Sequence, residues 1–333
     1  MEDNIIVNTF APVFIPTLCR AEHFIKLIDS LERCTWANKT EVYVSLDYPP
    51  SEKYEDGHNK IDAFLQLKQN SNTFKHLHVF RQEHNLGVLG NFAFLKQYMR
   101  RYDRFILSED DNVFSPNFLV FINKGLEKYK DDPSVVSING YTLPYEFRFG
   151  NNSFFKFNND FSAWGYGAFR DRWEEMENFF LSGGFKRSFS LKNIIKFKKH
   201  GLNHLREYLY YSHVNDPQKI KCYDVTVSCY LIVNDFTVIC PKVSTVRNEG
   251  WDNTGNSSFN TMLSRDEFVK YSERHMNQRI DDRADFLFEG DPRNFYDYNN
   301  KLAVRESSAR MSTNEFCHMM LSICLGKIRS VFK

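Results

Sequence analysis

Short apolar runs alternate with segments of helical spacing over residues 10–140, and this alternation restricts the folds open to the chain. Runs rich in Val, Ile, Leu and Phe lie at residues 13–15, 41–46, 77–80, 105–107 and 135–138. Between the first two runs, Phe24, Leu27, Ile28 and Leu31 recur at the spacing of one helix face. Strand–helix–strand repeats with short links favour right-handed crossovers between parallel strands. The sequence therefore predicts an α/β fold with a Rossmann-like, mainly parallel central sheet flanked by helices.

Ligands of such sheets bind beyond the carboxyl ends of the strands. The loops that follow Ile15, Leu46, Phe80 and Leu107 each begin with or contain polar residues. We therefore expect these loops to converge on one binding site.

Composition excludes several other classes of protein. The 333 residues carry 43 basic and 42 acidic side chains, a formal charge of +1, whereas a nucleic-acid-binding protein normally shows a basic excess. The seven cysteines form no C-x-x-C pair, so neither a zinc site nor a disulfide framework is expected. No apolar run approaches the roughly 18 residues of a membrane span, and the first residues, MEDNII, resemble no export signal. We expect a cytoplasmic protein that binds no nucleic acid.

The pattern changes near residue 141, where Asn and aromatic residues become frequent, and a basic stretch follows at residues 185–211. No long linker and no repeat of fixed period separates the two halves. We expect a nucleotide-binding half at residues 1–140 and a catalytic, acceptor-binding half of the same domain at residues 141–260. Residues 261–333 are expected to form a helical extension.

Three consecutive carboxylates, Glu109, Asp110 and Asp111, follow the fourth apolar run. Adjacent like charges are unfavourable unless a cation or hydrogen-bond donors compensate them. Mg²⁺ or Mn²⁺ would do so, because these ions are commonly held by one or two carboxylates together with substrate phosphates. The alternative is a solvated acidic turn before a helix that starts near Pro116. The position at the end of a buried strand favours the metal site.

The stretch F-I-L-S-E-D-D-N-V-F-S-P-N-F (residues 105–118) resembles the metal motif of the GT-A glycosyltransferases. It is especially similar to that of the N-acetylglucosaminyltransferases that begin complex N-glycans and of their bacterial relatives in surface-polysaccharide synthesis. The resemblance implies that Asp111 binds Mn²⁺ or Mg²⁺ and that Glu109 and Asp110 hold a nucleotide-sugar.

Three further strand ends are similar to motifs of that family. Arg20 follows the first strand, where the family has an arginine that contacts the nucleotide, and Asp47 ends the second, where the family has a carboxylate that recognises uracil. Asn85 and Gly87 lie in an N-L-G segment whose backbone approaches the nucleotide in the family. Taken singly, each has a plainer explanation: a surface arginine, a turn-forming aspartate and the start of a helix.

An aromatic stretch, F-S-A-W-G-Y-G-A-F-R-D-R-W (residues 161–173), is similar to a signature of the bacterial relatives. Trp164 and Gly165 are therefore candidates for the sugar pocket, since an aromatic face stacks on a sugar ring and glycine lets the backbone come close. Phe169 and Trp173 are better explained as core residues.

Asp224, in C-Y-D-V, is the counterpart of the family's general base, with Tyr223 in place of the usual Trp. Aspartate is also a preferred residue at helix starts, which is the alternative explanation.

A Gly/Asn-rich segment, N-E-G-W-D-N-T-G-N (residues 248–256), resembles a loop that closes over the diphosphate in the relatives. Gly250, Asp252 and Gly255 are its candidate donor-binding residues. Thr254 stands for the family's Ser and Asn256 for its His, so any phosphate contact of that His is missing. A plain turn is the alternative.

Together the motifs predict a metal-dependent, inverting glycosyltransferase that uses a UDP-sugar. The acceptor implied by the resemblance is a bacterial surface glycan or its lipid-linked precursor. Basic amphipathic segments at residues 186–199 and 316–333 would suit peripheral membrane contact on the cytoplasmic face. The alternatives are a sugar nucleotidyltransferase, which usually has a Gly-rich phosphate loop near its N-terminus, and a non-catalytic carbohydrate- or membrane-binding protein, which has no need of the acidic cluster.

Overall fold

The computed structural model describes residues 5–144, 151–200, 204–221, 224–252, 254, 265–290 and 313–324. The strands are β1 (Val13–Thr17), β2 (Glu41–Leu46), β3 (His76–Arg81), β4 (Arg104–Leu107), β5 (Asn112–Phe114), β6 (Val135–Asn139), β7 (Phe154–Phe157), β8 (Tyr166–Phe169), β9 (Thr237–Pro241) and β10 (Val246–Asn248). The helices are α1 (Ala21–Glu32), α2 (Glu55–Lys68), α3 (Gly87–Met99), α4 (Phe118–Lys128), α5 (Arg170–Leu181), α6 (Gly184–Ser188), α7 (Leu191–Lys199), α8 (Leu205–His213), α9 (Asp224–Asn234), α10 (Arg265–Met276) and α12 (Thr313–Cys324). Short 3₁₀ turns lie at Ala37–Lys39, Glu52–Tyr54 and Pro217–Lys219.

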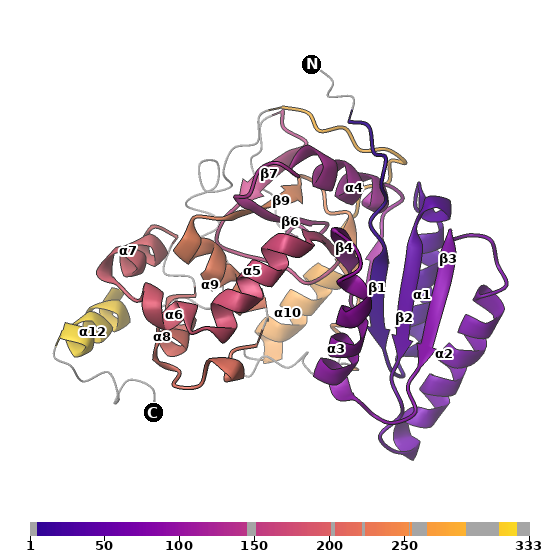
Figure 1. Cartoon of the computed structure of the whole chain (residues 1–333), viewed down its shortest axis with the longest axis horizontal. Coiled ribbons are helices and arrows are strands. Elements are labelled where there is room, and N and C mark those ends of the chain that lie inside the picture. The colour runs from indigo at the N-terminus through magenta and orange to yellow at the C-terminus, as the bar shows by residue number, and fades with distance from the viewer. Residues whose placement is uncertain are drawn as a thin grey trace. The chain divides into compact units, whose positions relative to one another are not determined.

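The described residues form one large sheet with the strand order β3-β2-β1-β4-β8-β6-β9-β7 (Figure 1). β1 pairs in parallel with both β2 and β4, and β2 pairs in parallel with β3. The chain therefore moves outward from β1 through β2 to β3 and then returns to the other side of β1 at β4. This reversal between β1 and β4 is a topological switch point, the place where open α/β sheets bind ligands.

β8 makes the sheet mixed, because it runs antiparallel to β4 and to β6. The expected α/β class, with a central sheet flanked by helices, is confirmed, and β1, β2, β3 and β4 form a parallel part of the sheet.

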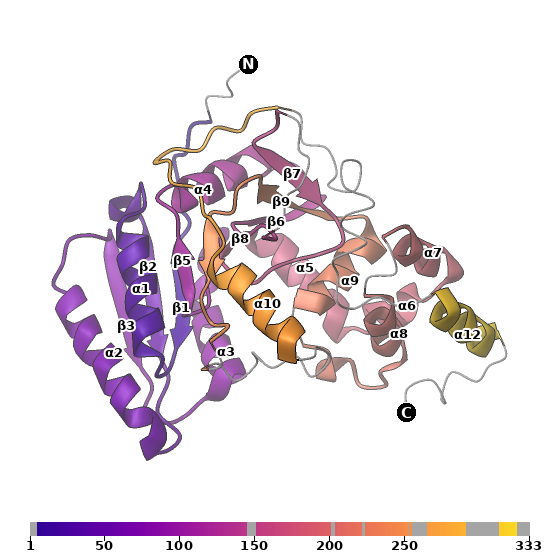
Figure 2. The ribbon, with the colours of Figure 1, turned by 180° about the vertical axis from the view of Figure 1, so that it is seen from behind.

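The predicted helix faces pack where the periodicity places them. Phe24, Leu27, Ile28 and Leu31 of α1 are fully buried in the core around β1 and β2. α3 lies on the opposite face of these strands from α1, as the two opposed views show (Figures 1 and 2). Helices on both faces cover β1 and β2, which agrees with the burial of all but one residue in each strand.

A glycine pair brings α4 close to the sheet. A Cβ on Gly125 of α4 would lie 2.7 Å from Cγ2 of Ile138 in β6, and one on Gly167 of β8 would lie 2.5 Å from Cγ2 of Ile122 in α4. Real Cβ atoms do not approach so closely, so any larger residue would push the helix away from the strands. The close packing fixes the sheet beside the turn that follows β4.

The chain divides into two compact units. The first holds Met1–Lys156, Ser162–Trp173 and Val238–Arg293, and thus the sheet. The second holds Phe157–Phe161, Glu174–Thr237 and Asn294–Lys333, and among its described residues α6, α7, α8 and α9 gather around buried Phe185, Phe197 and Tyr208. The domain boundaries expected near residues 140 and 260 stay a prediction.

Candidate functional site

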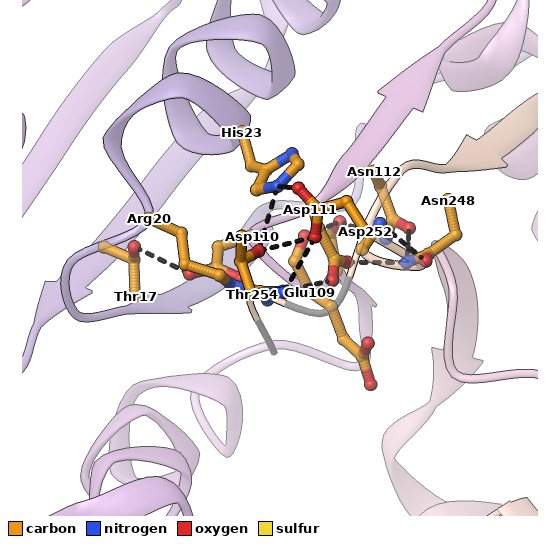
Figure 3. Close-up of polar contacts among 12 residues, drawn as sticks. Thr17, Arg20, His23, Glu109, Asp110, Asp111, Asn112, Asn248, Asp252 and Thr254 are labelled. Carbon is orange, nitrogen blue, oxygen red and sulfur yellow. Dashed lines mark hydrogen bonds and ion pairs between the residues drawn. The ribbon is translucent and has the colours of Figure 1, made fainter. Parts of the chain in front are cut away.

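Arg20 joins the two strand ends at the switch point. It follows β1 directly before α1, while Asp110 and Asp111 follow β4. Its guanidinium pairs with Oδ1 of Asp110 through Nη2 and with Oδ2 of Asp111 through Nη1, the latter at 2.8 Å (Figure 3). Thr17, the last residue of β1, donates its hydroxyl to Oδ2 of Asp110 at 3.0 Å. The predicted convergence of the loops after β1 and β4 is therefore present.

The charges of this cluster are buried and coupled. Asp110 and Asp111 are 8% and 6% exposed. Burial would lower the pKa of the Arg20 guanidinium, but the two carboxylates outweigh burial and raise it, so the guanidinium is always charged. Burial raises the pKa of the Asp110 carboxyl, and Arg20 opposes that rise. Glu109, in contrast, is exposed, and its side chain points away from the other two carboxylates (Figure 3).

The strand β10 supplies the other side of the cluster. It pairs antiparallel with β5 in a register that sets Asn248 opposite Asn112. In that position Asn248 donates through Nδ2 to Oδ1 of Asp111 at 2.5 Å and to Oδ1 of Asn112 at 3.1 Å. A cross-strand pair thus fixes the orientation of the Asp111 carboxylate.

The segment after β10 lies against Asp111. The Glu249 N–H donates to the Asp111 carbonyl at 2.8 Å, and a Cβ on Gly250 would overlap Oδ2 of Asp111. Only glycine leaves room here for the carboxylate, which accounts for Gly250 in the motif.

Two side chains of α1 bind the segment that follows β10. Nε2 of His23 lies 2.9 Å from Oδ2 of Asp252, and Nζ of Lys26 lies 3.0 Å from Oε2 of Glu249. Burial alone would raise the pKa of the Asp252 carboxyl, but hydrogen bonds from Thr254 and the nearby His23 lower it overall. The carboxylate is therefore ionised at neutral pH. Gly255 and Asn256, which complete the predicted loop, lie outside the described residues.

The residues around Asp111 could hold a divalent ion if Asp111 is its protein ligand. Among the described residues no three His, Cys, Asp or Glu side chains gather to hold a metal, so the protein would supply few ligands. Each Asp111 oxygen has one protein partner, Arg20 or Asn248, and a carboxylate oxygen can accept more than one contact. Mg²⁺ typically takes one or two carboxylates and completes its shell with water and substrate phosphates. Asp111 thus fits the predicted role of a single protein ligand.

Asp47 lies at the end of β2 and organises the neighbouring loop. It is 3% exposed, and its oxygens accept from the Tyr48 N–H at 2.9 Å, the Leu86 N–H at 2.8 Å and Nδ2 of Asn85 at 3.2 Å. These contacts hold the segment before α3, which starts at Gly87 with a φ of +67°. Asp47, Asn85 and Gly87 therefore lie together, and the geometry assigns to Asp47 the positioning of the N-L-G segment.

Trp164 lies in an aromatic cluster with Tyr141, Trp251 and His275. Its ring is edge-on to Tyr141 at 4.7 Å and to Trp251 at 5.9 Å, and His275 stacks on Trp251 at 5.2 Å. Trp164 and Trp251 are half-buried, while Tyr141 and His275 are buried. Since Trp251 directly follows Gly250, the cluster adjoins the residues that contact Asp111.

His275 is the fixed member of this aromatic cluster. The Tyr141 hydroxyl lies 2.7 Å from Nδ1 of His275, and burial lowers the pKa of the imidazole to about 3, so the ring is neutral at physiological pH. Gly165, with a φ of +69°, is packed against Val246 and Phe114. Its role is thus to let the chain enter β8 beside β10.

Asp224 begins α9 in the second unit and is half-buried. The position at the first turn favours the ionised carboxylate, because the N-terminal end of a helix carries partial positive charge. Cys222 and Tyr223 lie outside the described residues.

Several site residues escaped the sequence analysis. Asn248 begins the segment at residues 248–256 that the sequence analysis recognised, and Thr17 lies three positions before Arg20, so both polar side chains could have been found from the sequence. Asn91 of α3 is buried, and its Nδ2 donates to the carbonyls of Thr17 and Ser45. These two hydrogen bonds connect the end of β1 to the end of β2. His23 and His275 have no local pattern that marks them.

Comparison with known proteins finds no matching family model and no matching curated protein. Among solved structures, the chain is similar to the mannosyltransferase PcManGT from Pyrobaculum calidifontis with GDP-Man and Mn²⁺, at 14% identity and a TM-score of 0.36 over 53% of this chain and 50% of that one. It is similar to GalNAc-T7 with UDP, GalNAc and Mn²⁺ at 12% identity and a TM-score of 0.42, over 80% and 48%. It is also similar to S. aureus TarS with UDP-GlcNAc at 17% identity and a TM-score of 0.31, over 44% and 38%.

The matched part spans half or less of each of those chains. These likenesses assign neither a family nor an activity to this chain, so its function has to come from its own residues.

Proposed function

We propose that this protein is a metal-dependent GT-A glycosyltransferase that transfers a sugar from a nucleoside diphosphate donor to a hydroxyl group. The observation that carries the proposal is the pairing of Arg20 with Asp110 and Asp111 at the carboxyl ends of β1 and β4. A cation and two buried carboxylates at a topological switch point suit a diphosphate and its metal ion.

In this proposal Asp111 holds Mn²⁺ or Mg²⁺, which when bound stabilises the negative charge of the leaving diphosphate. Arg20 binds the diphosphate, and Asp110 and Glu109 hold the nucleotide-sugar. Asp110 is suited to positioning, because its oxygens already bind Arg20 and Thr17. Glu109 is exposed at the surface of the same turn, where a ligand can reach its carboxylate.

UDP is the nucleotide that we propose. Asp47 is nearly inaccessible and uses its oxygens on Tyr48, Leu86 and Asn85. In this proposal Asp47 does not contact the uracil itself. It positions the segment before α3, and the exposed Asn85 side chain and the Gly87 backbone contact the uracil. The ring of Trp164, which directly precedes Gly165, would stack on the sugar.

Gly250 and Asp252, together with Gly255, would close the segment after β10 over the diphosphate and exclude water. The contacts of Glu249 and Asp252 with α1, and of the Glu249 N–H with the Asp111 carbonyl, support this proposal.

Asp224 is the proposed general base. The acceptor hydroxyl attacks the anomeric carbon and gives its proton to the Asp224 carboxylate, while the bond from that carbon to the diphosphate oxygen breaks and the diphosphate leaves with the electron pair. A single displacement of this kind inverts the anomeric configuration. The proposed acceptor is a bacterial surface glycan or a lipid-linked oligosaccharide.

Thermal unfolding with Mn²⁺ and a panel of UDP-, GDP-, dTDP- and CMP-sugars tests the proposal. A donor at about a hundred times its Kd should raise Tm by ~5 °C, because it binds only the native state. Asp111→Asn should abolish the metal-dependent rise, whereas Asp56→Asn, at a side chain 81% exposed on α2, should keep it.

The two alternatives give different outcomes. A nucleotidyltransferase would be stabilised by a nucleoside triphosphate and a sugar phosphate. A binding protein would respond to glycans equally in wild type and Asp111→Asn. Product NMR tests Asp224 separately, since a retained anomeric configuration would exclude its assigned role.

A further inference from the structure

The helix α7 exposes one face that combines apolar and basic side chains. Ser190 caps its start by accepting from the Asn193 N–H at 3.3 Å, and Ile194 and Phe197 are buried in the second unit. The exposed side chains of the helix are Leu191, Lys192, Ile195, Lys198 and Lys199. Residues one, four, seven and eight positions after the first lie on the same side of a helix, so these five form a single stripe, the α7 stripe.

The apolar members of the α7 stripe are well exposed. Leu191 is 61% and Ile195 47% exposed, with α12 in place beside the helix. The two residues are one helical turn apart, and lysines precede and follow Ile195 on the same face. A single exposed aliphatic side chain is ordinary in a soluble protein. Two of them, Leu191 and Ile195, one turn apart among lysines, form an amphipathic surface of the kind found at lipid interfaces.

The chain segment that carries the stripe bears only basic charges. Residues 184–199 contain six basic and no acidic side chains, although the whole chain carries only +1. One of the six, Lys196, is used within the unit, where its Nζ lies 2.6 Å from Asp235 and donates to the Val233 carbonyl at 2.7 Å. Lys192, Lys198 and Lys199 remain on the stripe and face outward.

We propose that the α7 stripe docks on the surface of an anionic lipid bilayer. Leu191 and Ile195 enter the boundary between headgroups and acyl chains, while the three lysines contact the headgroup phosphates. The complementarity of charge favours anionic lipid, and the paired aliphatic residues favour a bilayer over a purely ionic partner such as a nucleic acid.

α12 lies at one end of the stripe, where Nζ of Lys198 is 5.8 Å from the Phe316 ring. Residues 325–333, the rest of the second basic segment predicted from the sequence, lie outside the described residues. The docking surface argued here is therefore the α7 stripe alone. No described helix is long and apolar enough to cross a membrane.

Cosedimentation of the full chain with vesicles tests this proposal without any glycosyl transfer, so its failure is distinct from failure of the proposed activity. Vesicles of phosphatidylcholine with about a third phosphatidylglycerol should bind the protein, and pure phosphatidylcholine should bind it far less. Added salt should weaken the binding, since lysines supply part of the attraction.

Two variants separate the contributions. Lys192→Gln/Lys198→Gln/Lys199→Gln should weaken partitioning about a hundredfold, at roughly a factor of five for each lysine. Leu191→Ser/Ile195→Ser should weaken it by about tenfold or more. The control Lys60→Gln/Leu67→Ser changes an exposed lysine and an exposed leucine on α2 and should bind like wild type.

Equal binding to neutral and anionic vesicles, or no binding to either, would overturn the proposal. Wild-type binding by both α7 variants would do the same, since it would place the contact elsewhere. Unchanged thermal unfolding of the variants shows that the loss comes from the surface and not from the fold.

Discussion

Nη1 of Arg20 lies 2.8 Å from Oδ2 of Asp111, and the same guanidinium holds Asp110. One cation therefore links the end of β1 to the end of β4 and compensates part of the charge of the two buried carboxylates. The first consequence concerns stability, because a buried carboxylate without a cation is strongly unfavourable.

Arg20→Met should lower the free energy of unfolding by about 3–5 kcal/mol at pH 7, since it leaves two adjacent buried charges uncompensated. Urea denaturation followed by circular dichroism measures the change. The triple variant with Asp110→Asn and Asp111→Asn removes those charges and should regain most of the loss. An equal loss in the single and triple variants would show that Arg20 stabilises the fold through packing and not through charge.

Gly250→Ala should disturb the site from the opposite side. The new Cβ would overlap Oδ2 of Asp111 and lie 3.1 Å from Nη1 of Arg20, so the carboxylate or the segment has to move. We expect a destabilisation of about 1–3 kcal/mol and loss of the metal-dependent rise in Tm.

Gly183→Ala is the matched control for that variant. Gly183, unlike Gly250, has a positive φ, +77°, and the nearest atom to its new Cβ would be Cγ of Pro217 at 3.5 Å, an ordinary contact. It should cost about 1 kcal/mol through backbone strain and leave donor binding intact. A wild-type Tm response in Gly250→Ala would refute the packing of Gly250 on Asp111.

Local patterns were sufficient where one element determines the outcome. The predicted run at residues 41–46 is β2 to the residue, and the predicted apolar face of α1, Phe24, Leu27, Ile28 and Leu31, is buried. Because carboxyl ends of parallel strands share one edge, the sequence also indicated that Arg20 would meet Asp110 and Asp111. That inference needed no contact information.

Long-range pairings were not accessible from local patterns. Asn248 reaches Asp111 only because β10 pairs with β5, more than 130 positions away in the sequence. His275 joins the aromatic cluster from α10, in a region expected to be a separate helical extension. The role of Asp47 was also not accessible from the sequence. An aspartate can contact a ligand or hold a buried backbone segment, and only its burial in the structure distinguishes the two roles.

Asp47→Ala tests the structural role of that carboxylate. Loss of its oxygens would leave the Leu86 N–H and the Tyr48 N–H without this acceptor, so we expect a destabilisation of about 1–3 kcal/mol. Hydrogen exchange of the Leu86 amide should become faster, and affinity for the donor should fall because the segment before α3 loses its support. Unchanged exchange at Leu86 would contradict the positioning role and leave direct contact with the nucleotide as the explanation for any lost affinity.

Asp160, in the second unit, makes stability depend on pH. Burial raises the pKa of its carboxyl to about 6, although the Phe161 N–H and the Ser228 hydroxyl donate to it. His204, 3.9 Å away, does not compensate the charge, because burial lowers the pKa of its imidazole. In the unfolded chain the aspartate should titrate near 3.9, so between about pH 4 and 6 the native state binds more protons than the unfolded state.

Stability should therefore decrease as the pH rises through that window and stay level above it. Asp160→Asn removes the titration while keeping an oxygen that can accept both hydrogen bonds. The variant should equal wild type near pH 4 and exceed it at pH 8 by about 1–2 kcal/mol, a value reduced for solvent screening because 38% of the side chain is exposed. Urea denaturation at pH 4, 5, 6 and 8 measures the difference, and a difference that does not grow with pH would show that the Asp160 carboxylate is solvated in the folded chain.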